Sequence, residues 1–185
     1  MKKSDILRFI LLSAVLFCMI FSIAACGAPS DKDDGGKIDG DSVIVPKDFS
    51  FALVFGLYGQ SSYDSESGKL VKTTNATNPD DYVTELFLSE ESLKAIFETL
   101  SALDLSSYPE EYDPNENEMT EPSQTLILTV RNGETKTVEC KDIAIGYYSD
   151  DEKGQKFLTA VKQIIDIIQA TDEWKALPDY EFYYD

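Results

Sequence analysis

The chain has 185 residues, of which 43% are hydrophobic and 27% charged, a composition typical of a globular protein and not of a disordered one. Its 34 acidic residues outnumber 16 basic ones, so the net charge at pH 7 is -18. Such a surface repels nucleic acid and anionic lipid headgroups, which argues against both as partners of the folded domain. The sequence has no histidine, which removes the commonest general base and transition-metal ligand.

The first 25 residues have the layout of a cleavable export signal. Three basic residues lie among the first eight, and an apolar stretch follows over residues 9–23. A stable membrane-spanning helix is the alternative, but it needs about 20 apolar residues, and this run stops at residues 27–29 before the chain becomes strongly acidic.

The apolar stretch ends in Ile23, Ala24, Ala25 and Cys26. These residues resemble the lipobox of bacterial lipoproteins, in which a branched aliphatic and two small residues precede a cysteine. The resemblance covers only residues 1–26. It implies that Cys26 receives a thioether-linked diacylglycerol, that residues 1–25 are removed by the lipoprotein signal peptidase, and that the protein is anchored outside the cytoplasm. Two fatty chains suffice for stable anchoring, since each buried methylene contributes about 0.8 kcal/mol.

Residues 26–46 are rich in glycine, aspartate and serine, which predicts a flexible acidic linker between the membrane anchor and a single globular domain at residues 47–185. The leader holds three of the 16 basic residues and one of the 34 acidic ones. Its removal leaves 13 basic and 33 acidic residues, a net charge of -20. Solubility alone accounts for such acidity, while a basic partner or a cation stays possible.

The first half of the domain predicts three strands and a helix. Apolar and small residues alternate over residues 49–58, which indicates a half-buried strand. Residues 59–68 form a polar turn region, and short strands follow at 69–74 and 82–88. Ser89 then caps a helix whose apolar face is formed by Leu93, Ile96, Phe97, Leu100 and Leu103.

The second half predicts a hairpin and a second helix after a long acidic loop at 106–124. Asn132-Gly133 between two strand patterns is the strongest short signal for a two-residue turn. That turn pairs Arg131 with Glu134 and Ile127 with Val138. It also places Leu126, Leu128 and Val130 opposite Glu139, Thr137 and Thr135, which leaves open the face of the hairpin that is buried. A further strand is an option at 141–149, and a helix follows from about residue 152 to 170.

The element order is therefore βββα followed by ββα, with one optional strand more. We expect an α+β fold, with an antiparallel sheet of about five or six strands and two helices packed on one face. Trp174 and Leu177 are expected to attach the tail after the second helix to the body.

Two kinds of side chain are candidates for binding. Asp113, Asn115 and Asn117 have the alternating oxygen ligands that open a calcium-binding loop, although Glu118 stands where that loop needs glycine and Gln124 where it needs a bidentate glutamate. Tyrosines and Trp174 are candidate stacking platforms for sugars or peptides or, alternatively, core and rim residues. The tyrosines are Tyr108, Tyr112, Tyr147, Tyr148, Tyr180, Tyr183 and Tyr184.

The sequence nominates no catalytic residue. Cys140 ends an apolar strand pattern without a base to activate its thiol, so we expect a buried, unreactive side chain. Three functions remain: a surface module that binds a peptide, protein or glycan; a calcium-binding or structural envelope lipoprotein; and a hydrolase that uses two carboxylates. The lipid on Cys26 and the missing catalytic groups favour the first of these.

Overall fold

The computed structural model describes residues 43–56, 61–74, 81–115, 124–143 and 146–179. Every described residue lies in one compact unit, Ser42–Asp185. The predicted signal, Cys26 and most of the predicted linker lie outside the described residues. Of the helices in the described ranges, none is long and apolar enough to cross a membrane.

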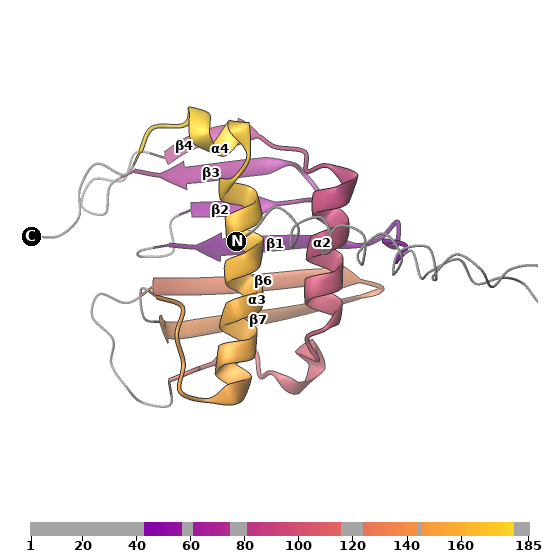
Figure 1. Cartoon of the computed structure of the whole chain (residues 1–185), viewed down its shortest axis with the longest axis vertical. Coiled ribbons are helices and arrows are strands. Elements are labelled where there is room, and N and C mark those ends of the chain that lie inside the picture. The colour runs from indigo at the N-terminus through magenta and orange to yellow at the C-terminus, as the bar shows by residue number, and fades with distance from the viewer. Residues whose placement is uncertain (1–42, 57–60, 75–80, 116–123, 144–145, 180–185) are drawn as a thin grey trace, which may run out of the picture. The chain divides into compact units, whose positions relative to one another are not determined.

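One seven-stranded sheet forms a layer of the domain (Figure 1). Its strands lie in the order β4-β3-β2-β1-β6-β7-β5. They are β1 (Ser50–Phe55), β2 (Ser61–Asp64), β3 (Lys69–Thr73), β4 (Asp81–Glu85), β5 (Glu111–Tyr112), β6 (Gln124–Asn132) and β7 (Glu134–Ile143). All neighbours are antiparallel except β5 and β7, which are parallel. The α+β class is confirmed, whereas the expected antiparallel sheet of five or six strands is wrong in strand number and in the direction of β5.

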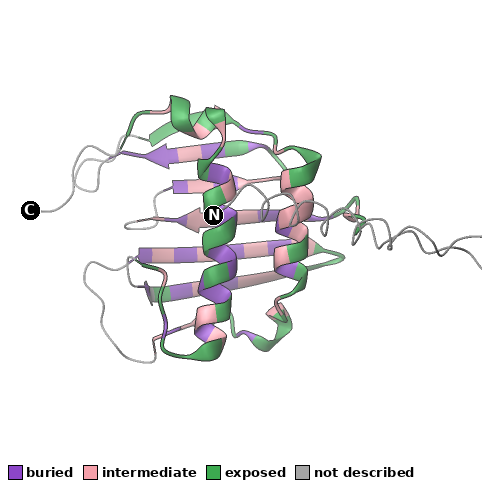
Figure 2. Ribbon diagram, in the orientation of Figure 1, coloured by how far each residue is buried: buried purple, intermediate pink, exposed green. Residues whose placement is uncertain are grey.

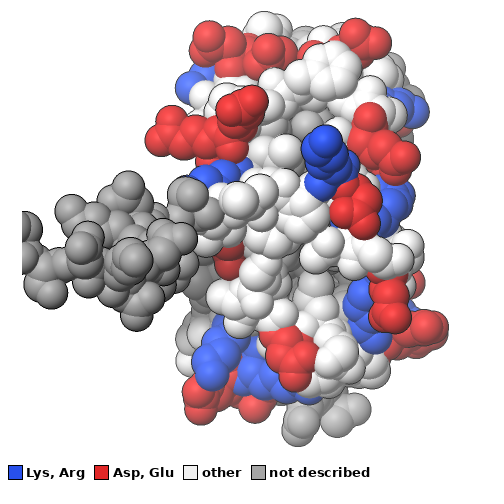
Figure 3. Space-filling model, turned by 90° about the vertical axis from the view of Figure 1, so that its right-hand side faces the viewer, with Lys and Arg blue, Asp and Glu red and all other residues white. Residues whose placement is uncertain are grey.

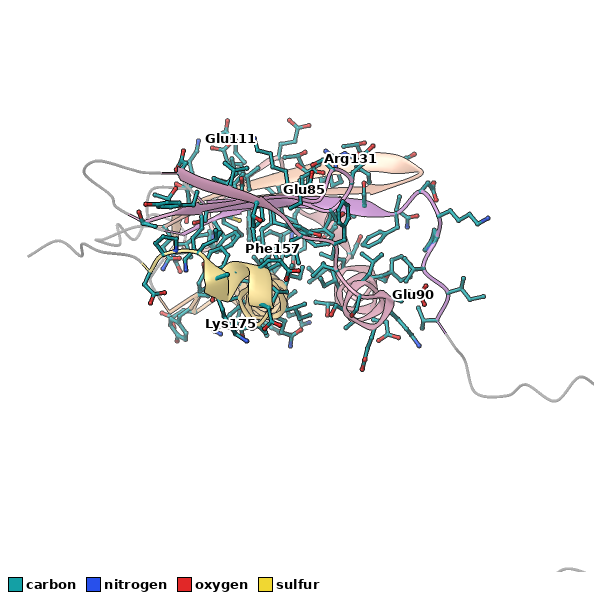
Figure 4. All side chains as sticks on the ribbon, turned by 90° about the horizontal axis from the view of Figure 1, so that it is seen from above. Glu85, Glu90, Glu111, Arg131, Phe157 and Lys175 are labelled. Carbon is teal, nitrogen blue, oxygen red and sulfur yellow. The ribbon has the colours of Figure 1, made fainter. Side chains whose placement is uncertain are left out.

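The helices cover one face of this sheet. They are α2 (Glu90–Ser101), α3 (Glu152–Gln169) and the short α4 (Asp172–Ala176), one more than the two helices expected, with a 3-10 turn, η1 (Leu105–Ser107), after α2. Seen from above, the helices lie on one side of the sheet, and Arg131 and Glu111 lie on the other (Figure 4). The predicted cap of α2 is confirmed, because the Ser92 N–H donates to the Ser89 side chain over 3.1 Å.

Two of the strands were not expected from the sequence. β2 lies within the region predicted as a polar turn, and β5 lies within the predicted acidic loop. β2 has only polar residues and one tyrosine, but it lies between β1 and β3, which satisfy its backbone on both edges. Tyr63 is 2% exposed and donates to the Leu86 carbonyl over 3.1 Å. Tertiary pairing therefore overrides a weak local preference.

The β6–β7 hairpin differs from its predicted register by one residue. Leu128 lies opposite Val138, and Leu126 lies opposite Cys140. The two-residue turn would have placed Leu126 and Leu128 opposite polar residues. A shift of one residue changes which side chains of the two strands share a face of the sheet, and the observed register buries Leu126 and Leu128 together with Val138 and Cys140 on the helix side. Burial of these side chains outweighs the local turn preference.

The predicted strand at 141–149 is not a separate element among the described residues. β7 continues to Ile143, and residues 146–149 are not in a strand. The predicted helix at 152–170 is confirmed as α3, and α4 follows it after Thr171, whose side chain accepts from the Trp174 N–H.

The core lies between the sheet and the helices, and α3 buries one side while its other side is exposed (Figure 2). Phe51 and Leu53 of β1 and Phe157 and Ile164 of α3 are fully buried. Each such side chain stabilises the fold by about 1.5–3 kcal/mol relative to an exposed position. The alternation predicted for β1 is confirmed, because its odd-numbered residues face this core.

Candidate functional site

A groove of about 650 Å³ lies between the C-terminal end of α2, the first half of α3 and the loop at 148–151. Thr99 and Leu103 line it from the α2 side, and Gln155 and Gln163 from α3. Tyr148 lines it from the loop and is 58% exposed. Helix packing thus leaves a hollow on the face of the domain opposite the uncovered side of the sheet.

A buried hydrogen-bond cluster holds the loop beside the groove. The Ser149 hydroxyl donates to the Pro114 carbonyl, and the Ser149 N–H donates to Gln155 Oε1 over 3.1 Å. A Cβ at position 154 would collide with Ser149 Oγ and meet the Pro114 carbonyl oxygen, so glycine is required there. The 113–115 segment, the loop and the start of α3 therefore form one fixed unit.

Tyr147 gives this loop an unusual backbone. Its φ is 52°, and no other described residue except glycine has a positive φ. A bulky side chain in this region costs about 1–3 kcal/mol and persists only where the surroundings hold it. The Tyr147 ring packs against the core, and burial, followed by the charge of Asp166, raises its pKa to about 12.

The turn at Tyr147 directs the next side chain outward. Tyr148 donates its hydroxyl hydrogen to the Asp150 carboxylate, and this bond raises the pKa of Tyr148. Its phenol is held at one end, whereas the rest of the side chain remains exposed at the groove. An aromatic ring fixed in this way offers an apolar face without a large loss of side-chain freedom.

The groove exposes mainly apolar atoms, and its side chains include six that are uncharged and polar beside the charged Asp150, Asp151, Glu152 and Lys156. Gln155 Nε2 donates to Thr159 Oγ1 over 3.1 Å, and Glu152 pairs with Lys156 over 3.0 Å at an exposed position. Amide and hydroxyl groups both donate and accept, so these side chains can bind hydroxyl or amide groups of a ligand whose other surface packs on the apolar lining. On the side of the domain shown in Figure 3, acidic and basic side chains are interspersed around an uncharged band.

The tyrosines predicted as candidates fall into separate groups. Tyr108 is 4% exposed, packs edge-on against Tyr112 at 5.2 Å and donates to the Lys153 carbonyl. Burial raises the pKa of both phenols. Tyr147 packs against the core, and Tyr148 lines the groove. The remaining three, Tyr180, Tyr183 and Tyr184, lie outside the described residues.

Trp174 is a packing residue, as was expected of the tail. Its ring stacks on Phe55 with centroids 5.7 Å apart. Lys72 donates to the Leu177 carbonyl over 3.2 Å, so the tail is held to the sheet at two points. No local pattern indicates Lys72 for this role, because Lys72 and Trp174 are 102 residues apart.

The predicted calcium ligands are described only in part. The Asn115 N–H donates to Asp113 Oδ1 over 2.9 Å, and Asn117 lies outside the described residues. Within the described ranges, no group of three or more acidic or cysteine side chains is arranged to hold a metal ion. The calcium loop stays a prediction.

Cys140 is buried in β7, as expected from its strand pattern. Burial, followed by the charges of Asp113 and Glu139, raises its pKa to about 12. The thiolate is the reactive form, so this side chain is unreactive at neutral pH.

Sequence inspection did not single out the α3 side of the groove. Gln155, Thr159 and Gln163 recur every four residues, which aligns them along one face of the helix. This stripe of uncharged polar residues is the sequence signal that could have identified the α3 wall of the groove.

No protein-family model matches this chain, and a search of curated proteins finds no similar sequence. Its function must therefore be inferred from the residues themselves.

Proposed function

We propose that this chain is an exported lipoprotein, anchored to the bacterial cell membrane by a lipid on Cys26, and that its domain binds a peptide, protein or glycan in the α2–α3 groove. The charged start, the apolar stretch and the lipobox-like residues at 23–26 support the anchor. The groove, with its aromatic side chain and its mainly apolar lining that carries a few uncharged polar groups, supports binding.

The observation that carries the binding site is the strained backbone of Tyr147 beside the exposed ring of Tyr148. Backbone strain is retained where it positions a group, and here it directs a tyrosine outward at a groove. The buried hydrogen bond from the Ser149 hydroxyl to the Pro114 carbonyl also holds this loop in place. A loop held so firmly presents its side chains with little entropy to lose on binding.

The anchor is tested by intact-mass analysis of protein extracted from membranes of producing cells. We expect a mass without residues 1–25 and with a diacylglycerol on Cys26. A Cys26→Ser variant is the control, and it should lose the lipid and leave the membrane fraction. An unprocessed, unacylated chain in the membrane would reject this part of the proposal.

The binding site is tested by screening the full-length chain against glycan and peptide arrays. The strongest hits are then titrated against Tyr148→Ala, which should weaken binding about tenfold or more, as the loss of an aromatic anchor commonly does. Ile44→Ala removes another exposed apolar side chain, outside the groove, and serves as the matched control. Equal affinities for the native chain and Tyr148→Ala would place the ligand elsewhere.

A further inference from the structure

Strand β4 is one end of the sheet. It pairs with β3, and in the described part of the chain no strand lies on its other side. Its residues are largely exposed, with Val83 at 60% and Tyr82 at 38%. Free strand edges pair readily with other chains unless they are covered, so an uncovered edge that exposes Val83 and Tyr82 indicates an interaction surface.

One hydrogen bond at the end of the β3–β4 pair identifies the residues whose backbone groups face this free edge. The Leu86 N–H donates to the Gly68 carbonyl over 2.7 Å, directly beyond the pair of Glu85 with Lys69. In an antiparallel ladder, bonded and non-bonded pairs alternate. Tyr82 and Thr84 therefore direct their N–H and C=O groups toward β3. Asp81, Val83 and Glu85 direct theirs toward the free edge.

The side chains of the same three residues share one face of the sheet, because they alternate with Tyr82 and Thr84. Val83 lies opposite Val71, and Glu85 lies opposite Lys69. Asp81 accepts a hydrogen bond from the Thr73 hydroxyl over 2.6 Å. The edge thus presents an apolar centre with a carboxylate two positions to either side, and β4 itself contains no basic residue.

Just after β4, Phe87 extends the apolar surface. It is 70% exposed, and its ring lies against Gly68 in the turn between β2 and β3. Phe87, Val83 and Tyr82 are three of the six large hydrophobic residues exposed in the described ranges. Half of the exposed large hydrophobic residues of the described ranges therefore lie in one short segment at this end of the sheet.

The charges on β4 disfavour a second copy of the chain as its partner. Antiparallel pairing of two β4 strands centred on Val83 places Asp81 of each copy opposite Glu85 of the other. Like charges directly opposite one another destabilise a strand pair, and this pairing has two such contacts. The same carboxylates attract a strand that carries basic residues at those positions.

We propose that the free edge of β4 binds an extended segment of a partner protein as an eighth strand, antiparallel to β4, with an apolar residue opposite Val83 and Lys or Arg opposite Asp81 and Glu85. Backbone bonds to residues 81, 83 and 85 supply the docking, and the alternate side chains supply specificity. This surface is separate from the α2–α3 groove, so its test is independent of the test of that binding site.

The test uses the native full-length chain and a synthetic peptide with the core Lys-Thr-Val-Thr-Lys between Gly-Ser ends. We expect binding that weakens as salt is added, and weakening of about fivefold or more when the central Val is N-methylated, because that N–H faces β4. N-methylation of an adjacent Thr is the matched control. The N–H of that Thr faces away from β4, so the methylated peptide should bind with unchanged affinity.

Variants of the chain test the same surface from the other side. Val83→Pro removes an N–H that points away from β3. This variant should no longer bind the peptide, while its free energy of unfolding should stay close to that of the native chain. Glu85→Lys should weaken binding of the basic peptide and strengthen that of a peptide with Glu in place of Lys.

Three results would overturn the proposal. The first is equal loss of affinity from both N-methylated peptides, and the second is undiminished binding to a folded Val83→Pro variant. The third is self-association of the native chain that Val83→Pro abolishes, without peptide binding, which would make a second copy the occupant. The N-methylation comparison needs no variant to fold, so it decides the question by itself.

Discussion

The ammonium group of Lys72 in β3 lies 4.9 Å from the centre of the Trp174 ring in α4. The Lys72 side chain is only 7% exposed. It also donates to the carbonyls of Trp174 and Leu177 and lies 3.5 Å from an Asp179 carboxylate oxygen. A buried charge needs such partners, so the tail of the chain satisfies a cation that the sheet presents.

We therefore expect Lys72→Met to lower the free energy of unfolding by about 2 kcal/mol, from the lost cation–π contact and charged hydrogen bonds. Urea unfolding measures the change. Lys162→Met is the control, because the exposed pair of Lys162 with Asp166 contributes less than about 0.5 kcal/mol. Equal losses in the two variants would contradict the role of Lys72.

Gly154 is expected to be irreplaceable at the start of α3. Gly154→Ala places a methyl group against Ser149 Oγ and the Pro114 carbonyl and should destabilise the domain by about 1–3 kcal/mol. Gly146→Ala is the matched control, because nothing lies within 4 Å of the added carbon there. Thermal unfolding of both variants gives the comparison, and a Gly154→Ala midpoint no lower than that of Gly146→Ala would be inconsistent with this packing.

The stability of the domain is expected to fall in alkaline solution. Burial raises the pKa of Cys140 from 9.0 to about 12. Below pH 9 the thiol is protonated in both states, whereas above pH 9 the unfolded chain releases the proton and the folded chain does not. Stability due to Cys140 is therefore lost progressively as the pH rises from 9 to 12.

Denaturant unfolding at a series of pH values measures this loss. Cys140→Ala should flatten the dependence between pH 9 and 10, before Tyr63, whose pKa burial raises from 10.0 to about 12, adds its own contribution. An unchanged slope in Cys140→Ala would show that the thiol titrates normally in the folded chain.

A calcium site at Asp113, Asn115 and Asn117 predicts a higher melting temperature in calcium than in magnesium at equal ionic strength, because a ligand that binds only the folded state stabilises it by mass action. Asp113→Ala should remove the difference. Identical melting temperatures in the two salts would mean that this loop is simply a solvated acidic segment.

The hairpin register can be tested by cross-linking. Thr129 lies opposite Thr137, with the two hydroxyl oxygens 3.0 Å apart. The double variant Thr129→Cys with Thr137→Cys should oxidise to a disulfide, whereas Leu128→Cys with Thr137→Cys should not, because those side chains lie on opposite faces. A two-residue turn would reverse this outcome, and mass analysis after oxidation distinguishes the two.

Several elements followed from local sequence alone. Alternating apolar residues were enough for β1, and a regular apolar stripe was enough for α2 and α3, with Ser89 at the start of α2. These signals are strong because a long periodic pattern has only one face that can be buried. The α+β class follows from their order.

Other features depended on residues distant in the chain. β2 and β5 have too few apolar residues to be recognised, and each becomes a strand because a neighbour pairs with its backbone. The groove likewise needs α2, α3 and the 148–151 loop to be brought together, and only Tyr148 of its lining was a candidate beforehand.

By itself, the sequence determined the acidic charge, the absence of histidine chemistry, the lipobox-like residues at 23–26 and the main helices and strands, since these are properties of composition and of local period. The tertiary structure decided the hairpin register, the contact of Lys72 with Trp174 and the position of Tyr148 at a groove. Each of these depends on burial and pairing between distant segments, whose free energies exceed the local preferences of a turn or a short strand.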